Sequence, residues 1–470
     1  MALTATDSPV IPAVQSRAER WIVWLLVGLS LLFAIVPDTL SVNALGPEAN
    51  HTVTQGSMLR QLQFGALFIA AGLVALRHAG TMLRNLRAAN LFLIVIMLYC
   101  GASAAWSPYP DITIKRTIIF AGLILIGLAV APPRSTPRQF LRVVLGTYTA
   151  ILVISLFVAL LIPSVGVDTF LGNAWRGITW QKNMLGSIAG FAALLWMREW
   201  LMEPRQRGSS AAGFLFAAFM LVMAKSATAI LVTGLGGVVY LFTRRRWLGG
   251  RHAGLIVMLG AVTVALYALL LFYVSQGRMP TPHDVVELVT SLFNKSSDLT
   301  GRGEIWSLVD ITIRQHTLWG VGYSAFWTGA GGPSQYIGDK LGWLPGQAHN
   351  GFLDILIDMG QVGMGLFIAC VVWHLISIMR LFRLDREDAA MHLGIFVTIM
   401  ISNFSESQIL RDTSFQNIMF ICSSLAISGR LAAHHAAGRR DARAAREARE
   451  RISAAQPRPA LAIVHREQTQ

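Results

Sequence analysis

A single histidine at the end of a long polar segment has the chemistry and the placement expected of a general base. His349 is followed by Asn350 and then by an apolar run. Imidazole is the side chain whose ordinary pKa lets it accept a proton near neutral pH. We therefore predict that His349 is catalytic and that Asn350 supports it. The alternative is that this histidine caps a helix or lies at a membrane interface.

Cationic side chains precede two of the expected helices. Arg176 and Lys182 lie in RGITWQKNMLG, and Arg302 comes before the amphipathic stretch GEIWSLVDITIRQ. The N-terminus of a helix favours an anion, and arginine grips phosphate with two parallel hydrogen bonds. We predict that Arg176 and Lys182 bind an anionic ligand and that Arg302 binds phosphate, which the family resemblance described below narrows to a diphosphate. The alternatives are interfacial anchoring of the first two and an ion pair of Arg302 with Glu304 or Asp298.

Further ionisable side chains lie at the ends of apolar runs, where they are usually functional or paired with an opposite charge. Lys225 begins the segment KSATA, and Glu406 lies in NFSES. We predict supporting roles for both in the same site. Asp354 and Asp358 share one face of the helix that follows the histidine. They are expected either to act in the site or to pair with an arginine.

The sequence lacks the motifs that bind nucleotides or metals. It has no GxxxxGK[ST] phosphate loop, no HExxH pair, no CxxC pair and no DxD pair. The three cysteines, Cys100, Cys370 and Cys422, lie within apolar stretches and are expected to be buried as small hydrophobic residues. We therefore predict a site without a metal and without a cofactor.

The composition indicates a chain whose solvent is lipid. Of the 470 residues 54% are hydrophobic and only 14% are charged, and the mean hydropathy is +0.54. A net charge of +14 would normally suggest nucleic acid as a partner. Here the basic residues cluster between apolar runs, as membrane topology requires, so we expect no nucleic-acid binding.

The candidate site residues must be positioned by membrane helices. In lipid no water is present to bond backbone N–H and C=O groups, so each apolar run must form a helix. We predict an all-α integral membrane protein of about 12 transmembrane helices. Residues 21–274 contain the first nine, 275–350 form a long loop with short helices, and 351–430 contain the last three. The apolar runs are 21–36, 61–76, 90–105, 116–131, 142–162, 184–197, 211–224, 227–242, 253–273, 351–379, 390–404 and 414–430.

The distribution of arginine predicts the orientation. Alternate connections are rich in arginine, and with twelve spans they fall on the same side as residues 1–20 and the basic tail 431–470. The positive-inside rule places that side in the cytoplasm. Residues 275–350 then lie on the opposite, non-cytoplasmic side of the membrane. The Arg-rich tail is expected to be a helix that contacts anionic membrane lipids.

The segment AHNGFLDILIDMGQVG resembles the signature of the O-antigen ligase and polysaccharide polymerase superfamily. It has the pattern His-Asn, nine residues, then Gly-x-x-Gly. Other pieces of the family pattern occur in order over residues 100–410, namely WSPYPDITIKR, RGITWQKNMLG, KSATA, LTGRGEIW and NFSES. One departure is Gln181, where many members have histidine, and it puts a catalytic role for that position in doubt.

The resemblance implies a metal-independent glycosyltransferase of the GT-C type that uses a glycan on undecaprenyl diphosphate as donor. It places the two phosphate-binding arginines at Arg176 and Arg302 and the essential loop histidine at His349. The acceptor is either another glycan, in a polymerase, or lipid A–core, in an O-antigen ligase. Other polysaccharide export and assembly proteins are implied as partners. The tail and WSPYPDITIKR look more like exopolysaccharide polymerases of the ExoQ type.

A transporter or flippase of lipid-linked sugars is the alternative from another class of protein. It would also place cations near a diphosphate. It would be expected to carry ionisable groups in mid-membrane and broken helices in both halves of the chain. Here the charges gather towards the ends of the predicted helices, which favours an enzyme.

Overall fold

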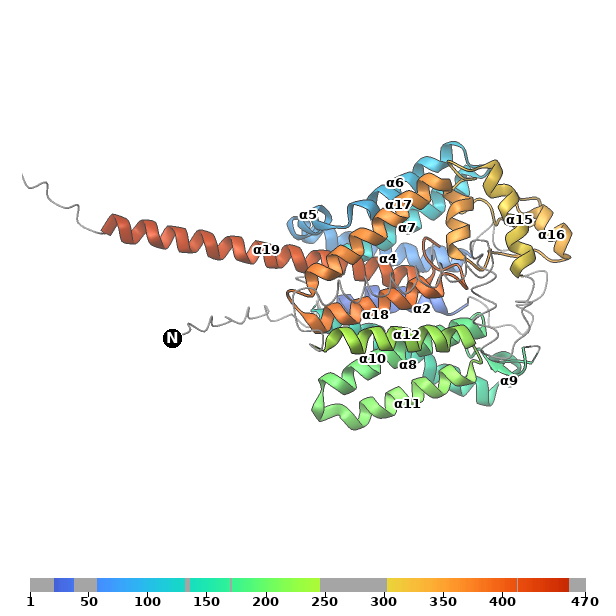
Figure 1. Ribbon diagram of the computed structural model, residues 1–470, viewed down its shortest axis with the longest axis horizontal. Coiled ribbons are helices and arrows are strands. Elements are labelled where there is room, and N and C mark those ends of the chain that lie inside the picture. The colour runs from blue at the N-terminus through green and yellow to red at the C-terminus, as the bar shows by residue number, and fades with distance from the viewer. Residues whose placement is uncertain are drawn as a thin grey trace, which may run out of the picture.

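The computed structural model describes residues 21–37, 57–131, 136–169, 171–245, 302–411 and 413–455, and most of them are helical (Figure 1). The elements of the first part are η1 (Trp24–Gly28), α2 (Leu29–Ile35), α4 (Met58–Arg77), α5 (Ala79–Ala88), α6 (Leu91–Ala102), η3 (Ser103–Ala105), α7 (Pro110–Val130), α8 (Pro137–Leu161), α9 (Pro163–Gly166), β1 (Val167–Asp168), β2 (Ala174–Trp175), α10 (Lys182–Met202), η4 (Pro204–Gln206), α11 (Arg207–Met223) and α12 (Ala227–Arg244). Those of the second part are α15 (Arg302–Gln315), α16 (Gln335–Leu341), α17 (Gly351–Leu381), α18 (Arg386–Ser402) and α19 (Phe415–Ala455). The strands β1 and β2 form one short antiparallel pair.

Each predicted apolar run within the described residues is occupied by a helix, which confirms the all-α membrane class. The run 253–273 lies outside the described residues, as do 1–20 and 275–301. Among the described helices, five are long and apolar enough to cross a membrane, or six if α5 and α6, bent by 94°, form one broken span. The number of twelve spans therefore stays a prediction.

Several helices begin at a side chain that accepts a hydrogen bond from a backbone N–H of the first turn. Such N-caps include Ser57 of α4, Thr136 of α8, Ser226 of α12, Asn350 of α17 and Asp385 of α18. A cap of this kind stabilises a helix by about 0.5–2 kcal/mol over alanine. Ser226 and Asn350 thus fix the starts of two helices beside the site.

Helix α17 is interrupted at Gly360, where the preceding loop inserts its backbone. Gly360 has φ 62° and ψ −164°, a conformation that side chains disfavour. The N–H of Gly322 donates to the carbonyl of Asp358 at 2.9 Å, in place of a bond within the helix. A Cβ at position 360 would lie 2.3 Å from the carbonyl oxygen of Leu318. A glycine is therefore required there, and it lets the loop pack tightly against the first turns of α17.

An aromatic cluster packs α8, α10 and α19 together. The ring of Phe415 lies edge-on to both Tyr148 and Phe191, with centroids 6.1 Å apart in each pair. Edge-to-face pairs contribute roughly 0.5–1.5 kcal/mol each beyond their burial. The start of α19 is consequently held against the middle of α8 and α10.

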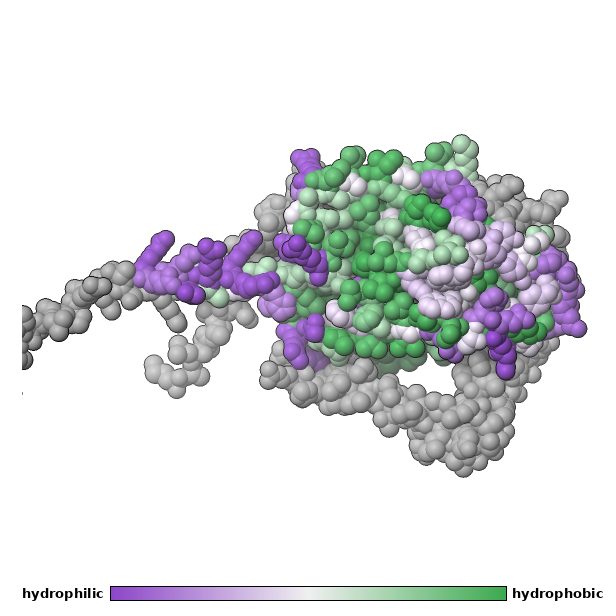
Figure 2. All heavy atoms as spheres, turned by 90° about the horizontal axis from the view of Figure 1, so that it is seen from above, coloured by the Kyte–Doolittle hydropathy of each residue, from purple (hydrophilic) through white to green (hydrophobic). Residues whose placement is uncertain are grey.

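Large apolar side chains are exposed on the outside of the bundle, as at Leu73 on α4, Leu98 on α6 and Leu160 on α8. Figure 2 shows apolar residues over much of one face and hydrophilic residues gathered towards the two ends. Soluble monomers rarely expose an apolar surface of this extent. The helical surface therefore faces lipid.

Helix α19 continues from the bundle into the basic tail (Figure 1). The predicted helical tail is confirmed as far as residue 455. Arg443 bonds Glu447 at 2.8 Å and Arg446 bonds Glu450 at 2.9 Å, each one turn apart. Such pairs support an exposed helix, by about 0.3–0.5 kcal/mol each.

Candidate active site

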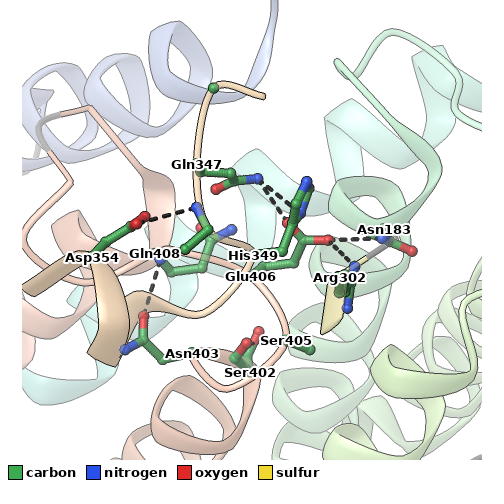
Figure 3. A network of polar contacts seen from close by, with 12 residues as sticks. Asn183, Arg302, Gln347, His349, Asp354, Ser402, Asn403, Ser405, Glu406 and Gln408 are labelled. Carbon is green, nitrogen blue, oxygen red and sulfur yellow. Dashed lines mark hydrogen bonds and ion pairs between the residues drawn. The ribbon is translucent and has the colours of Figure 1, made fainter. Parts of the chain in front are cut away.

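The carboxylate of Glu406 collects hydrogen bonds from four side chains (Figure 3). Its Oε1 accepts from Asn183 Nδ2 at 2.9 Å and from Arg302 Nη2 at 3.2 Å. Its Oε2 accepts from Gln347 Nε2 at 2.9 Å and from His349 Nδ1 at 3.1 Å. The side chain of Glu406 is only 8% exposed. We call these five residues the Glu406 cluster.

Members of the Glu406 cluster come from four segments that meet at one end of the bundle. Asn183 lies in the first turn of α10, and Arg302 is the first residue of α15. Gln347 and His349 belong to the loop before α17, and Glu406 to the loop between α18 and α19. The predicted site thus forms from helix ends, where backbone donors and side chains face the same space.

The backbone on both sides of His349 is fixed. Its φ is +51°, a left-handed conformation that costs a non-glycine residue about 1–3 kcal/mol. The N–H of Ala348 donates to Asp354 Oδ1 at 3.1 Å, and the N–H of Gly351 donates to the carbonyl of Asn403 at 2.8 Å. These bonds hold the imidazole against the carboxylate of the cluster.

Glu406 is negatively charged at neutral pH. Burial by itself raises the pKa of its carboxyl group, but the hydrogen bond from His349, the charge of that ring while it is protonated and the charge of Arg302 outweigh burial. The net pKa lies below the ordinary value of 4.5. The group is therefore an acceptor for all four of its neighbours.

This charge state assigns the tautomer of His349. A carboxylate only accepts, so the hydrogen must be on Nδ1, and in the neutral ring Nε2 is left to accept a proton. Gln347 Nε2 lies 3.2 Å from the same Nδ1, and both donors converge on one oxygen of Glu406. The arrangement can support general-base chemistry at Nε2 of His349.

Arg302 pairs with an acid that is distant in sequence. Glu304 and Asp298 were the expected alternatives in sequence, whereas the ion pair joins Arg302 to Glu406. Asp298 lies outside the described residues. The side chain of Arg302 is mostly buried, and a guanidinium held in this way can also present N–H donors to an anion.

A polar pocket adjoins the Glu406 cluster between α10, α12, α18 and α19. Asn183, Arg302 and Glu406 contribute to its wall. The wall also carries the hydroxyl groups of Ser187, Ser226, Thr228, Thr233, Thr398, Ser402 and Ser405. Hydroxyl groups both donate and accept hydrogen bonds, so this wall offers polar partners beside the Glu406 cluster.

Two other predicted cations lie nearby but outside the Glu406 cluster. Arg176 is buried, and its Nε donates to the carbonyl of Val165 at 2.7 Å. Lys225 has φ +47°, and its Nζ donates to the carbonyl of Gly172 at 2.7 Å. These bonds tie the segment around the β1–β2 pair to its surroundings and to the turn before α12.

Lys182 and Asn350 occupy helix starts. Lys182 is the first residue of α10, and the residue after it, Asn183, bonds Glu406 and accepts from Ser226 Oγ at 3.0 Å. Asn350 is buried and caps α17 through its own side-chain oxygen. The geometry gives Asn350 a structural role in positioning the residue before it.

The acidic pair after the histidine supports the loop rather than entering the Glu406 cluster. Asp354 accepts from Trp327 Nε1 at 2.8 Å as well as from the loop backbone. Arg411 donates to Gln347 Oε1 at 3.0 Å and to the carbonyl of Gly346 at 3.1 Å. The two hydrogen bonds from Arg411 orient the side chain of Gln347 towards Glu406.

Gln347 and Asn183 are the cluster residues that the sequence interpretation did not name, and Gln347 had a signal in the sequence. Gln347 lies two residues before His349, and in an extended segment this spacing places both side chains on the same side of the chain. The spacing could therefore have identified Gln347 as a neighbour of the histidine. Among the described residues, no group of three His, Cys, Asp or Glu side chains is placed to hold a metal ion.

The comparisons with known proteins agree with this architecture. Residues 212–368 match a family model described as O-antigen ligase, a range that includes Arg302, Gln347 and His349. The match and the apolar helices indicate a multi-pass membrane protein that is similar to the O-antigen ligase and polysaccharide polymerase superfamily.

A curated relative adds a more specific likeness. The chain is 24% identical over 341 residues to the exopolysaccharide production protein ExoQ of Rhizobium meliloti (strain 1021). The alignment covers 69% of this chain and 73% of that protein. The predicted resemblance to the superfamily is thereby confirmed.

Proposed function

We propose that this protein is an inner-membrane glycosyltransferase that moves a glycan from undecaprenyl diphosphate to an acceptor hydroxyl, as an exopolysaccharide or O-antigen polymerase. The observation that carries the proposal is an imidazole oriented by a buried carboxylate, with a guanidinium bonded to the same carboxylate. This combination supplies a base and a phosphate ligand at one end of a membrane bundle.

The proposed reaction is a displacement at the anomeric carbon of the donor. Nε2 of His349 takes the proton of the acceptor hydroxyl as the oxygen bonds to that carbon. The bond from the carbon to the bridging phosphate oxygen breaks, and its electron pair leaves with the diphosphate. Arg302, together with Arg176 and Lys182, stabilises the charge that grows there. The proposed mechanism needs no metal ion.

The membrane placement follows from the same proposal. The Glu406 cluster lies at the end of the bundle that carries α15 and α16, opposite the end from which α19 projects (Figure 1). We assign the cluster to the periplasmic side and both termini to the cytoplasm, because the basic tail favours the cytoplasm. The glycan donor and its acceptor would meet the site on the periplasmic surface.

Deletion of the gene should distinguish a polymerase from a ligase. Loss of a polymerase is expected to remove long polymer and to leave single repeat units, as judged by size fractionation of the glycans. The likeness to ExoQ favours this outcome. The family description favours the second candidate, a ligase, whose loss would leave lipid-linked polymer that never reaches lipid A–core. Full-length, correctly attached polymer in the deletion strain would contradict both functions.

Transfer by the purified protein should continue in a chelator. With a polyprenyl diphosphate glycan as donor, we expect the same rate of product formation in EDTA as in magnesium, within about twofold, because arginine side chains replace the metal. Product can be followed by gel shift of a labelled glycan, with His349→Asn protein as the inactive control. Activity that disappears in EDTA and returns with magnesium would contradict the metal-free mechanism.

A further inference from the structure

A basic groove lies between α5 and α19, at the end of the bundle opposite the Glu406 cluster (Figure 1). Arg84 and Arg87 line it from α5, and His435 and Arg439 line it from α19. None of the described residues that line the groove is acidic. With its open mouth it holds about 1240 Å³, which is ample for a phosphate group and its substituents. Positive charge concentrated in this way attracts an anion.

Two other arginines at this end of the bundle have acidic partners. Arg244 bonds Glu387 at 2.8 Å, and Arg430 bonds Asp385 at 2.7 Å. In contrast, Nε and Nη2 of Arg84 are buried and have no hydrogen-bond partner in the part of the chain that the structure describes. A buried cationic donor that lacks an acceptor is costly. The groove therefore presents cationic side chains, and a bound ligand would supply the anion that Arg84 lacks.

Helix α5 has the character of a helix that lies in a membrane surface. It is bent by 94° from the apolar helix that follows it. Its Leu83 and Leu86 are 47% and 42% exposed, each next to one of the groove arginines in sequence. Helices with exposed apolar residues beside arginines lie at the boundary between head groups and acyl chains.

We propose that this groove binds the head group of an anionic phospholipid. The phosphate would contact Arg84, Arg87 and Arg439, and the acyl chains would follow Leu83 and Leu86 into the bilayer. The exposed leucines favour a lipid over a soluble phosphate compound. The absence of acidic side chains among the described lining residues disfavours a zwitterionic head group, because its ammonium would meet only cations. The bound lipid would join α5 to the start of the basic tail.

The test uses the full-length protein purified in neutral detergent. Dioleoylphosphatidylglycerol should remain bound in native mass spectrometry and raise the midpoint of thermal unfolding, whereas dioleoylphosphatidylcholine should do neither. The double variant Arg84→Gln/Arg87→Gln is expected to weaken apparent binding of phosphatidylglycerol by roughly tenfold or more, because each lost charge weakens the attraction to anionic lipid. Glycerol 3-phosphate at matched concentration should not reproduce the thermal shift.

The matched control is Arg443→Gln/Arg446→Gln, which removes the same charge from the part of α19 beyond the groove. Its side chains are 83% and 81% exposed, and its binding should change by less than about twofold. An equal loss in both double variants, equal binding of phosphatidylcholine, or a full shift with glycerol 3-phosphate would each overturn the proposal. If the groove double variant fails to fold, Arg439→Gln on the other wall must show the loss.

Discussion

Replacing His349 with asparagine should lower the rate of glycan transfer by about 10²–10⁴-fold, the loss typical when a general base is removed. Asparagine suits this position because it tolerates the left-handed backbone that His349 adopts. Alanine would remove the imidazole and also strain the loop. The asparagine variant therefore separates the chemistry of the ring from the conformation of the chain.

The measurement is the initial rate of product formation by protein reconstituted in lipid, with the thermal midpoint as a check on folding. His316→Asn is a matched control, because that histidine is exposed at the end of α15, and its rate should stay within about twofold. Added imidazole should partly restore a His349→Gly variant, in which the ring is missing and the backbone remains relaxed. If His349→Asn keeps more than about a tenth of the wild-type rate, His349 is not the base.

The helices could be predicted from the sequence because lipid leaves the backbone few choices. Apolar runs must be helical, so α7, α8 and α17 follow from composition alone. The break in α17 could not be predicted in this way. It depends on how the loop around Leu318 packs against Gly360, and no local pattern records a contact between a loop and a helix. The glycine was recognised as part of a motif, but its purpose appears only in the fold.

Three residues of the Glu406 cluster could be predicted one by one, but the arrangement of the cluster could not. His349, Arg302 and Glu406 were each identified from residue type and placement. Their grouping depends on helix ends that lie far apart in sequence, because Glu406 bonds Asn183 and Arg302 across separations of 223 and 104 residues. As the alternative to phosphate binding, local reasoning could offer Arg302 only neighbouring acids as partners, since only those are visible in sequence. The central role of Glu406 therefore emerged from tertiary packing.

Replacing Glu406 with glutamine should be nearly as damaging as losing the imidazole, although the shape of the side chain is kept. The amide has one oxygen, so its NH₂ group must face one of the two pairs of donors. If it faces His349, Nδ1 must accept, the ring proton moves to Nε2, and the base is lost. If it faces Arg302 and Asn183, the guanidinium loses its counter-charge. We expect a fall in kcat of about 10²–10⁴-fold, because loss of an orienting carboxylate removes the reactive tautomer.

The pH dependence and a control make this prediction specific to the Glu406 cluster. The pKa of Glu406 is lowered in the folded protein, so its stabilising contribution is present above the ordinary 4.5 and is lost only as pH falls through the lowered value. Protonation of Glu406 should therefore contribute nothing to the pH dependence of the wild-type kcat between about pH 6 and 8, where the carboxylate is fully charged. Glu304→Gln makes the same chemical change two residues from Arg302, on the exposed face of α15, and should leave the rate within about twofold. Equal rates for the two variants would show that Glu406 does not position the base. A large loss confined to Glu406→Gln, with the fraction of folded protein unchanged, would support a single catalytic unit built from helix ends.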